Sequence, residues 1–257
     1  MLDGKRVLVT GAGQGIGRGI ALAVAEAGAD VGLIDLNPDT LRETGRLVEQ
    51  AGRRGLVLVA DVTNANSISA AIRRFVAELG PLDGIVNNAG VIEMQEASDV
   101  TREAWDRQFA VNVWGLMSCS QLAARQMIAQ ATPGAIVNIA SNAGKVGYGN
   151  MAAYNATKAA VINLTRTLST EWSKHGITVN AVCPGGVDTP MLKRAASWVA
   201  ERSDLDADAL YAAMKPNLMD RHIQPIEVGR VVAFLLSKDA VIIRGQSINV
   251  DGGDTPY

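Results

Sequence analysis

Short apolar runs rich in β-branched residues alternate along the chain with longer segments whose apolar positions recur at helical spacing. Such runs, bounded by turn residues, are typical of fully buried strands, and the longer segments are typical of helices that bury one face. Alternation of this kind from one end to the other predicts an α/β fold with a doubly wound, seven-stranded parallel sheet and helices on both faces. The expected strands cover residues 6–10, 30–35, 56–61, 82–87, 135–140, 177–182 and 246–250.

Helices are expected after each of the first five strands. Asn37-Pro38-Asp39 carries the N-cap and first-turn signals of the second helix. The fourth is unusually long, and we expect it to break near Asn112. The expected helices cover residues 15–27, 64–78 and 102–128, with two more that begin near residues 38 and 151.

The segment from about Met191 to Ile223 precedes the last strand and is predicted to be an irregular, partly helical insertion. No repeat, low-complexity tract or linker divides the sequence. We therefore expect a single domain over residues 1–257.

Composition and charge restrict the class of protein. Of the 257 residues, 48% are hydrophobic and 19% are charged, which suits a soluble globular protein with a substantial core. The net charge of -2 gives no reason to expect binding to nucleic acid or to a membrane surface. A short strand follows the N-terminus directly and no long uncharged apolar segment is present, so we expect a cytoplasmic protein without membrane spans.

Residues that commonly bind metals are few. Cys119 and Cys183 are far apart and have no partners at metal-ligand spacing, so we expect reduced thiols. His175 and His222 have no acidic or cysteine partners at ligand spacing either. No metal site is expected.

A glycine-rich segment, TGAGQGIG, follows the first strand directly and opens the first helix. Glycines there permit a tight turn and a close approach of the backbone to a ligand, and the helix N-terminus can receive a pyrophosphate. A tight turn without a ligand is the alternative, because glycine pairs alone are weak evidence. The motif comprises Gly11, Gln14, Gly15, Ile16 and Gly17.

Asp35 ends the second strand, where a carboxylate can accept hydrogen bonds from the adenosine ribose. It would also repel the 2′-phosphate of NADP, and Gln14 and Leu36 supply no positive charge to bind that phosphate. This charge pattern favours NAD over NADP. A carboxylate that caps the next helix near Asn37 is the alternative.

Ser141 ends the fifth strand, and Tyr154 and Lys158 lie four residues apart on the helix that follows. That spacing places the phenol and the ammonium on one helix face as neighbours. With the hydroxyl of Ser141 beside them, the three groups form a plausible site of proton transfer. Alone, the Tyr-x-x-x-Lys pair would more often be an ordinary surface pair.

Together with Asn87-Asn88-Ala89-Gly90 after the fourth strand and Pro184-Gly185 after the sixth, these motifs resemble the short-chain dehydrogenase/reductase family. The resemblance covers essentially the whole chain, with the motifs in the family's order. It implies a Rossmann-type sheet and NAD(P)-dependent oxidation or reduction of small-molecule alcohols and carbonyls. It also implies a homotetramer, with the helices after the fourth and fifth strands in one interface.

The resemblance assigns catalytic roles to four residues. It implies that Tyr154 is the general acid/base, with a pKa lowered from about 10 by Lys158 and by the positive charge of the nicotinamide. Lys158 would also bind the nicotinamide ribose, and Ser141 would hold the substrate oxygen. Asn112 would support a water chain that carries protons to solvent, although an asparagine there could instead satisfy backbone groups at a kink.

Other family positions imply contacts with the adenosine half of the cofactor. Asp61 and Val62 would lie at the adenine, unless Asp61 is simply a solvated turn residue. Asn87 and Ala89 would line the adenosine side, while Asn88 and Gly90 more plausibly hold the loop itself.

Val187 and Thr189 match the positions that contact the nicotinamide carboxamide in relatives, with a generic glycine turn as the alternative. Residues 190–223 would form a lid that closes over the substrate. The apolar residues of this segment could equally be ordinary core.

The substrate predicted for this site is a secondary alcohol or its ketone. Polar residues in loop 142–150 favour a polyol, sugar or small diol, unless those side chains face solvent. A 3-oxoacyl thioester reductase is the alternative enzyme, and Asp35 argues against its usual NADPH. A dinucleotide-sensing regulator without catalysis is the alternative outside enzymes. The C-terminal segment 251–257 could reach a neighbouring subunit.

Overall fold

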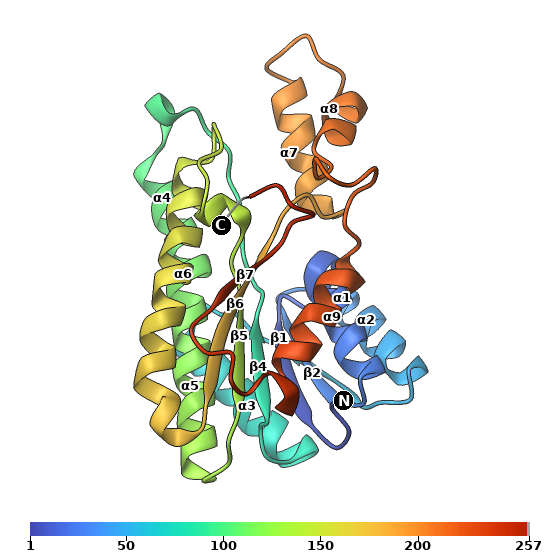
Figure 1. The fold of residues 1–257 in the computed structure, drawn as a ribbon, viewed down its shortest axis with the longest axis vertical. Helices are drawn as coiled ribbons and strands as arrows, with labels where there is room; N and C mark the ends of the chain where they lie inside the picture. The colour runs from blue at the N-terminus through green and yellow to red at the C-terminus, as the bar shows by residue number, and fades with distance from the viewer. Residues whose placement is uncertain (256–257) are drawn as a thin grey trace.

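The computed structural model describes residues 1–255 as seven parallel strands in one sheet with helices packed on both faces (Figure 1). The strand order is β3-β2-β1-β4-β5-β6-β7, so the direction of winding reverses between β1 and β4. Ligands of open α/β sheets bind at such a reversal, outside the carboxyl ends of the strands. The strands are β1 (Arg6–Thr10), β2 (Asp30–Asp35), β3 (Gly55–Val59), β4 (Gly84–Asn87), β5 (Ala135–Ile139), β6 (Thr178–Pro184) and β7 (Ser247–Val250).

Two large apolar cores lie on the two faces of this sheet, and a third, smaller cluster includes residues of α5, α6 and β6. One large core packs α1, α2 and α9 against the sheet, and the other packs α3, α5 and α6 against the opposite face. The doubly wound α/β fold expected from the hydrophobic pattern is therefore confirmed. The helices are α1 (Gly15–Glu26), α2 (Pro38–Gln50), α3 (Ala65–Leu79), α4 (Arg102–Phe109), α5 (Leu116–Ala129), α6 (Ala152–Trp172), α7 (Pro190–Ala200), α8 (Ala207–Ala213) and α9 (Pro225–Leu235).

Helix α9 was not expected from the sequence. Pro225 occupies its first turn, and a capping box joins Gln224 to Glu227. The helix crosses α1 at two glycines. A Cβ atom at Gly229 would lie 2.6 Å from the carbonyl oxygen of Gly19, so only glycine permits this close crossing.

The sequence suggested that the long helix after β4 breaks near Asn112, but the helix is continuous there. Helix α4 continues through a π-helical turn, η2 (Ala110–Gly115), directly into α5. Such a turn contains one extra residue within a continuous helix and often lies at a functional site. Asn112 is in this turn and is buried.

The insertion before the last strand forms α7 and α8, which project beyond the carboxyl ends of the strands (Figure 1). Pro190 and the side chain of Thr189 begin α7. Within residues 1–255, no helix combines the length and apolar character needed to cross a membrane.

Candidate active site

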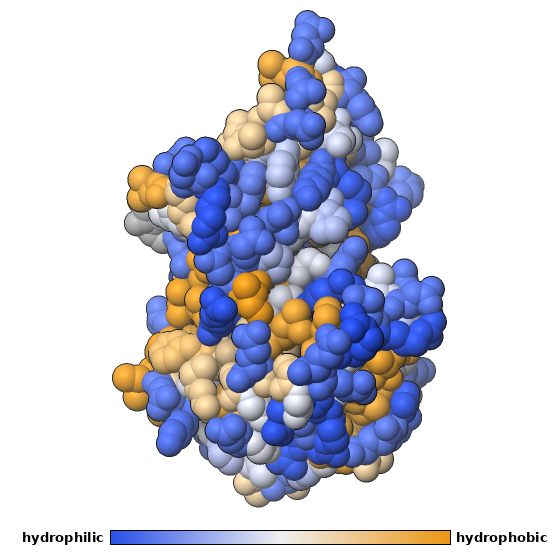
Figure 2. Space-filling view, turned by 90° about the vertical axis from the view of Figure 1, so that its right-hand side faces the viewer, coloured by the Kyte–Doolittle hydropathy of each residue, from blue (hydrophilic) through white to orange (hydrophobic). Residues whose placement is uncertain are grey.

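A cavity of about 920 Å³ lies at the carboxyl ends of the strands, below α7 and α8. It extends from Asp35 and Asp61 at one end to Tyr154 and Lys158 at the other. The surface is hollowed where the insertion meets the rest of the molecule (Figure 2). This volume lies within the range of about 300–1,000 Å³ typical of ligand and cofactor sites.

The glycine-rich turn leaves the N-terminus of α1 open to the cavity. Gln14 is the N-cap residue but makes no side-chain hydrogen bond to the helix, so the first N–H groups have no capping side chain. Gly15 has a φ of +54°, which favours glycine, and a Cβ atom there would lie 3.4 Å from Thr189. Gly11, Ile16 and Gly17 also line the cavity. An anionic group such as a pyrophosphate fits this arrangement.

Asp35 lines the cavity at the end of β2 and also holds the turn in place. One of its oxygens accepts a hydrogen bond from the Gly13 amide at 3.0 Å, and the other accepts one from the Leu36 amide at 2.7 Å. The Asn37 amide donates a third bond at 3.4 Å, and since an ionised carboxylate has about four acceptor positions, one remains for a ribose hydroxyl. The helix that follows is capped by Asn37 itself.

Of the residues expected to contact the adenosine half of the cofactor, all but one line the cavity. Asp61, Val62 and Ala89 line it. The Asn87 side chain does not, since it is buried and donates hydrogen bonds to Ser120 and Asn138, each at 2.8 Å. This side chain therefore links β4 to α5 and β5, and the expected place of Asn87 at the adenosine side of the cofactor stays a prediction.

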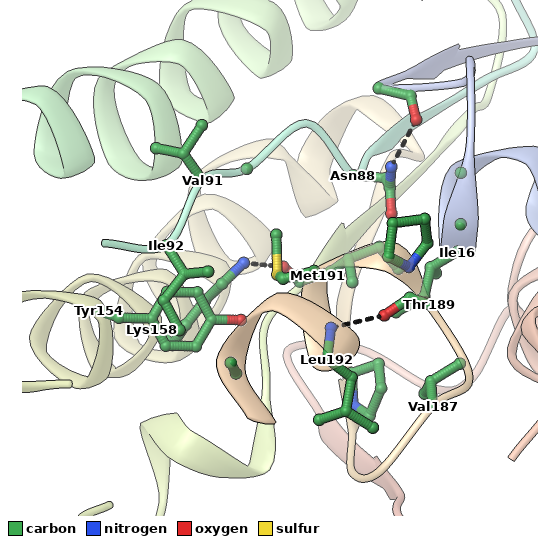
Figure 3. Close-up of a pocket in the computed structure, with 18 of the residues that line it drawn as sticks. Ile16, Asn88, Val91, Ile92, Tyr154, Lys158, Val187, Thr189, Met191 and Leu192 are labelled. Carbon is green, nitrogen blue, oxygen red and sulfur yellow. Dashed lines mark hydrogen bonds between the residues drawn. The ribbon is translucent and has the colours of Figure 1, made fainter. Parts of the chain in front are cut away.

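Asn88 joins the loop after β4, which it was expected to hold, to the glycine-rich turn. Its amide nitrogen donates to the carbonyl oxygens of Thr10 and Gly11, both at 3.0 Å. The bonds join the loop after β4 to the loop after β1, across the reversal of the sheet (Figure 3).

Tyr154, Lys158 and Ser141 meet at the other end of the cavity. Ser141 lies beside the phenol of Tyr154 and lowers its pKa, while its own hydroxyl donates to the Asn142 side-chain oxygen at 3.3 Å. The phenol points toward the first turn of α7 (Figure 3). The Lys158 ammonium lies 5.5 Å from the centre of the Tyr154 ring and donates to the Ile139 carbonyl oxygen at 2.8 Å. Tyr154 and Lys158 line the cavity, and so do the residues on either side of the buried Ser141.

The electrostatics of this triad differ from the expected arrangement. Burial raises the pKa of Tyr154 to about 12, and Ser141 opposes this only partly. Burial also lowers the pKa of Lys158 to about 8. The expected lowering of the tyrosine pKa by Lys158 is therefore not provided by the protein groups alone, because desolvation disfavours both charged forms.

The side chain of Asn112 links the π-helical turn η2 to the loop at Val91 and to α6. Its side chain accepts from the Val91 amide at 2.8 Å and donates to the Val91 carbonyl at 2.9 Å and to the Thr157 hydroxyl at 3.1 Å. Gly90 lies between Asn112 and Lys158, since a Cβ atom there would be 3.3 Å from the Asn112 side-chain oxygen and 3.6 Å from the Lys158 nitrogen. These partners lie 21 and 45 residues away in the sequence, so Asn112 does not simply satisfy backbone groups of its own turn.

Val187 and Thr189 line the cavity opposite the glycine-rich turn. Val187 forms an isolated parallel bridge with Ile223. The Thr189 hydroxyl accepts from the Leu192 amide at 3.2 Å and so caps α7 (Figure 3). The strand end and the insertion are thus joined at the cavity.

Several cavity residues were not singled out from the sequence. Val91 and Ile92 follow the loop after β4, and Met191 and Leu192 belong to the first turn of α7 (Figure 3). They place an apolar wall near Tyr154. The only signal for them was their position next to recognisable motifs.

The loop after Ser141 contributes fewer polar groups to the cavity than expected. Asn142 and Tyr148 line it, and the Asn142 amide donates to the Tyr148 hydroxyl at 2.8 Å. Asn155, from α6, donates to the Tyr148 carbonyl at 2.9 Å. Val146 and Gly147 make up the remainder of the loop's cavity surface.

In the part of the chain that the structure describes, no cluster of His, Cys, Asp and Glu could hold a metal ion. The donor groups of the cavity instead suit a dinucleotide. Backbone N–H groups lie near its middle, a carboxylate lies at one end, and hydroxyl and ammonium groups lie at the other.

Comparison with known proteins identifies relatives over nearly the whole chain. A family model described as Enoyl-(Acyl carrier protein) reductase matches residues 11–255. A short-chain dehydrogenase/reductase of Armillaria gallica is 40% identical over 97% of this chain and 95% of its own length. A 2-(S)-hydroxypropyl-CoM dehydrogenase of Xanthobacter autotrophicus is 37% identical, covering 97% and 96%.

A sorbitol dehydrogenase of Cereibacter sphaeroides is 36% identical over 98% of both chains. Among solved structures, a short-chain type dehydrogenase/reductase from Mycobacterium marinum superposes with a TM-score of 0.91 at 32% identity, covering 100% of this chain and 97% of its own. The likeness therefore extends to both sequence and fold.

Proposed function

The chain belongs to the short-chain dehydrogenase/reductase family, and on that premise we propose that it transfers a hydride between NAD and a secondary alcohol or its ketone. The family supports an oxidoreductase acting on CH–OH groups with a nicotinamide dinucleotide. The observation that carries the proposal is one continuous cavity, with an open helix N-terminus in its wall and Tyr154 and Lys158 at one end.

The preference for NAD rests on Asp35. Its carboxylate lies at the end of the cavity that would receive the adenosine ribose. A 2′-phosphate placed there would meet a negative charge, whereas two ribose hydroxyls would meet an acceptor. The 3-oxoacyl thioester reductase alternative usually takes NADPH and is disfavoured for the same reason.

Bound NAD would supply the hydride acceptor and a positive charge close to Tyr154. In alcohol oxidation, the phenolate form of Tyr154 accepts the proton of the substrate hydroxyl, and Ser141, which lies beside the phenol, holds the substrate oxygen. Lys158 keeps further N–H donors beyond its bond to Ile139 for the nicotinamide ribose. Because burial opposes the phenolate, proton acceptance by Tyr154 depends on positive charge brought into the site.

We assign the other cavity positions by their place along this path. Gly11, Gln14, Gly15, Ile16 and Gly17 would bind the pyrophosphate, and Asp61, Val62 and Ala89 would bind the adenosine half. Val187 and Thr189 would contact the carboxamide. Asn112 would fix the position of the lysine and of the loop at Val91, with a water chain to solvent as its further role.

For the substrate, we propose a polyol, sugar or small diol. Asn142 and Tyr148 provide an amide and a phenol beside the catalytic tyrosine, and one relative is a sorbitol dehydrogenase.

Residues 190–223 would act as the lid, since Met191, Leu192 and Met214 line the cavity. A cytoplasmic homotetramer is proposed from the family resemblance. Of the C-terminal segment 251–257 expected to reach a neighbour, residues 256 and 257 lie outside the described part of the chain.

The test is Tyr154→Phe, which removes only the phenol oxygen. We expect the variant to bind NADH with unchanged affinity, measured by fluorescence, and to lose nearly all turnover with the best alcohol. That alcohol is first found by following NADH formation with polyols, sugars, diols and hydroxy acids, using both NAD and NADP. Substantial residual turnover in the variant would contradict the assignment of the base. Nucleotide binding by the wild type without turnover of any alcohol would favour the dinucleotide-sensing alternative.

A further inference from the structure

Tyr211 joins the helical insertion to the chain segment that carries Val187 and Thr189. Its hydroxyl, on α8, donates a hydrogen bond of 2.6 Å to the carboxylate of Asp188. Asp188 lies between two residues that line the cavity, yet its own side chain reaches α8. One bond therefore connects α8 to the backbone at the nicotinamide end of the cavity.

The backbone of Tyr211 is held as well as its side chain. The ring of His222 stacks on the Tyr211 ring with centroids 4.2 Å apart and planes inclined by 16°. The Nε2 atom of His222 lies 3.0 Å from the Tyr211 carbonyl oxygen. The next residue, Ile223, accepts a bond from the Asp188 amide at 2.9 Å and donates one to the Gly186 carbonyl at 3.0 Å. Tyr211 thus closes a ring of contacts around residues 186–188 and 222–223.

Helix α7 contributes to the same carboxylate. The Lys193 ammonium lies 3.3 Å from the oxygen of Asp188 that Tyr211 contacts, and 5.4 Å from the centre of the Tyr211 ring. The Tyr211 hydroxyl, followed by Lys193, lowers the pKa of Asp188, while burial and the carboxylate raise the pKa of Tyr211 to about 12. At neutral pH a neutral phenol therefore donates to an ionised carboxylate, which is the stronger kind of hydrogen bond.

Movement of α8 would change the cavity directly. Ala213 and Met214, which follow Tyr211 within one turn, line the cavity, and so do Met191 and Leu192 of α7. The insertion lies beyond the carboxyl ends of the strands (Figure 1), and residues of both of its helices line the cavity. Asp188 is the point at which both helices are tied to residues 187–189.

We propose that Tyr211 is a positioning residue that, through Asp188, holds α7 and α8 against residues 187–189 and so sets the rate at which the reduced nucleotide leaves the cavity. The inference rests on the proposed function, because it takes Val187 and Thr189 as contacts of the nicotinamide. It adds a specific contact that controls release of the reduced nucleotide. The catalytic role proposed for Tyr154 does not require this contact.

The test compares NADH dissociation from the wild type and from Tyr211→Phe. The variant keeps the ring that stacks on His222 and loses only the hydroxyl. We expect stopped-flow displacement of NADH, followed by its fluorescence, to show dissociation about tenfold faster, the usual size of a lost hydrogen bond to a charged group. The KM for NAD should rise by a similar factor, while kcat with a slow, chemistry-limited alcohol should stay unchanged.

Two further variants separate this role from general stabilisation. Asp188→Asn keeps an acceptor without its charge and should accelerate release in the same direction by a smaller factor. Glu201→Gln removes an exposed ion pair with Arg202 that lies within residues 190–223 and outside the cavity lining, and it should leave the release rate unchanged. Wild-type release rates in both Tyr211→Phe and Asp188→Asn would overturn the proposal, even if their melting temperatures fell.

The failure of this inference and the failure of the proposed function give different results. A wild type that oxidises alcohols, paired with a Tyr211→Phe variant that releases nucleotide at the same rate, overturns the inference alone. A wild type that binds neither NADH nor NADPH overturns both.

Discussion

Replacing Gly229 by alanine would place a methyl group where α1 and α9 cross. A Cβ atom there would lie 2.6 Å from the Gly19 carbonyl oxygen and 2.7 Å from the Cβ atom of Ala23. Ordinary contacts between such atoms need about 3.5–4.0 Å, so the two helices must move apart by about 1 Å. The obstacle is largely backbone, which cannot rotate away as a flexible side chain can.

The size of the effect follows from two opposing contributions. Overpacking a close-packed interior costs about 1–3 kcal/mol of the free energy of unfolding, and a backbone obstacle favours the upper part of that range. Alanine in place of glycine inside a helix offsets about 1 kcal/mol. The net loss is about 2 kcal/mol, which for a chain of this length lowers the Tm by about 4–8 °C.

Thermal unfolding followed by circular dichroism measures this change, with Gly45→Ala as the control. Gly45 lies inside α2, and a Cβ atom there would meet the Val57 side chain at 3.3 Å, a contact that a slight shift relieves. In this control, alanine gains the same helix propensity over glycine but meets no backbone obstacle. The Tm of the control should therefore stay within about 4 °C of the wild type. A Gly229→Ala protein that melts at or above the wild-type temperature would show that the crossing is not as tight as described.

Two further predictions concern charge in the site. Asp35→Ser should reduce the ratio of kcat/KM with NAD to kcat/KM with NADP by at least about tenfold, because it removes both the ribose acceptor and the repulsion of the 2′-phosphate; an unchanged ratio would contradict the assignment of Asp35. Burial lowers the pKa of Lys158 from 10.5 to about 8, so the unfolded chain binds this proton more tightly than the folded protein does. The free energy of unfolding of the wild type, relative to Lys158→Met, should therefore increase as the pH rises from about 8 to about 10 in urea titrations. Parallel pH profiles for the two proteins would refute this.

The sheet was predictable because its strands are buried on both faces and therefore appear as continuous apolar runs. The ends of β3 and β4 were less predictable than the sheet itself. The expected strand over 82–87 begins only at Gly84, because Asp83 instead binds Lys5 and Arg6 at the amino ends of β1 and β4. Such pairing depends on residues far away in the sequence, which local pattern does not record.

Helix α9 had usable signals, namely Pro225 at its first turn, Glu227 two residues later, and apolar residues at 228, 231, 232 and 235. These signals did not lead to a predicted helix, because the segment directly before them was expected to be irregular. The tight crossing at Gly229 could not have been found, since it depends on two glycines that meet only in the folded protein.

The convergence of the site residues was predictable from motif order, but their electrostatics and side-chain directions were not. Asn87 is the last residue of β4, and the pleat of the strand decides which face its side chain takes. It faces Ser120 on α5. The raised pKa of Tyr154 follows from burial, which depends on the whole cavity rather than on the spacing to Lys158.

The pairing of α1 with α9 also has a consequence in time. The helix that opens at the glycine-rich turn is covered by a helix about 200 residues later, which at about 5–20 residues per second is synthesised roughly 10–40 s afterwards. Until then, apolar residues of α1 such as Ile20 and Val24 lack their final cover. During synthesis, the nucleotide-binding half of this protein therefore remains incomplete until α9 has been added, and the nascent chain needs protection from aggregation during that interval.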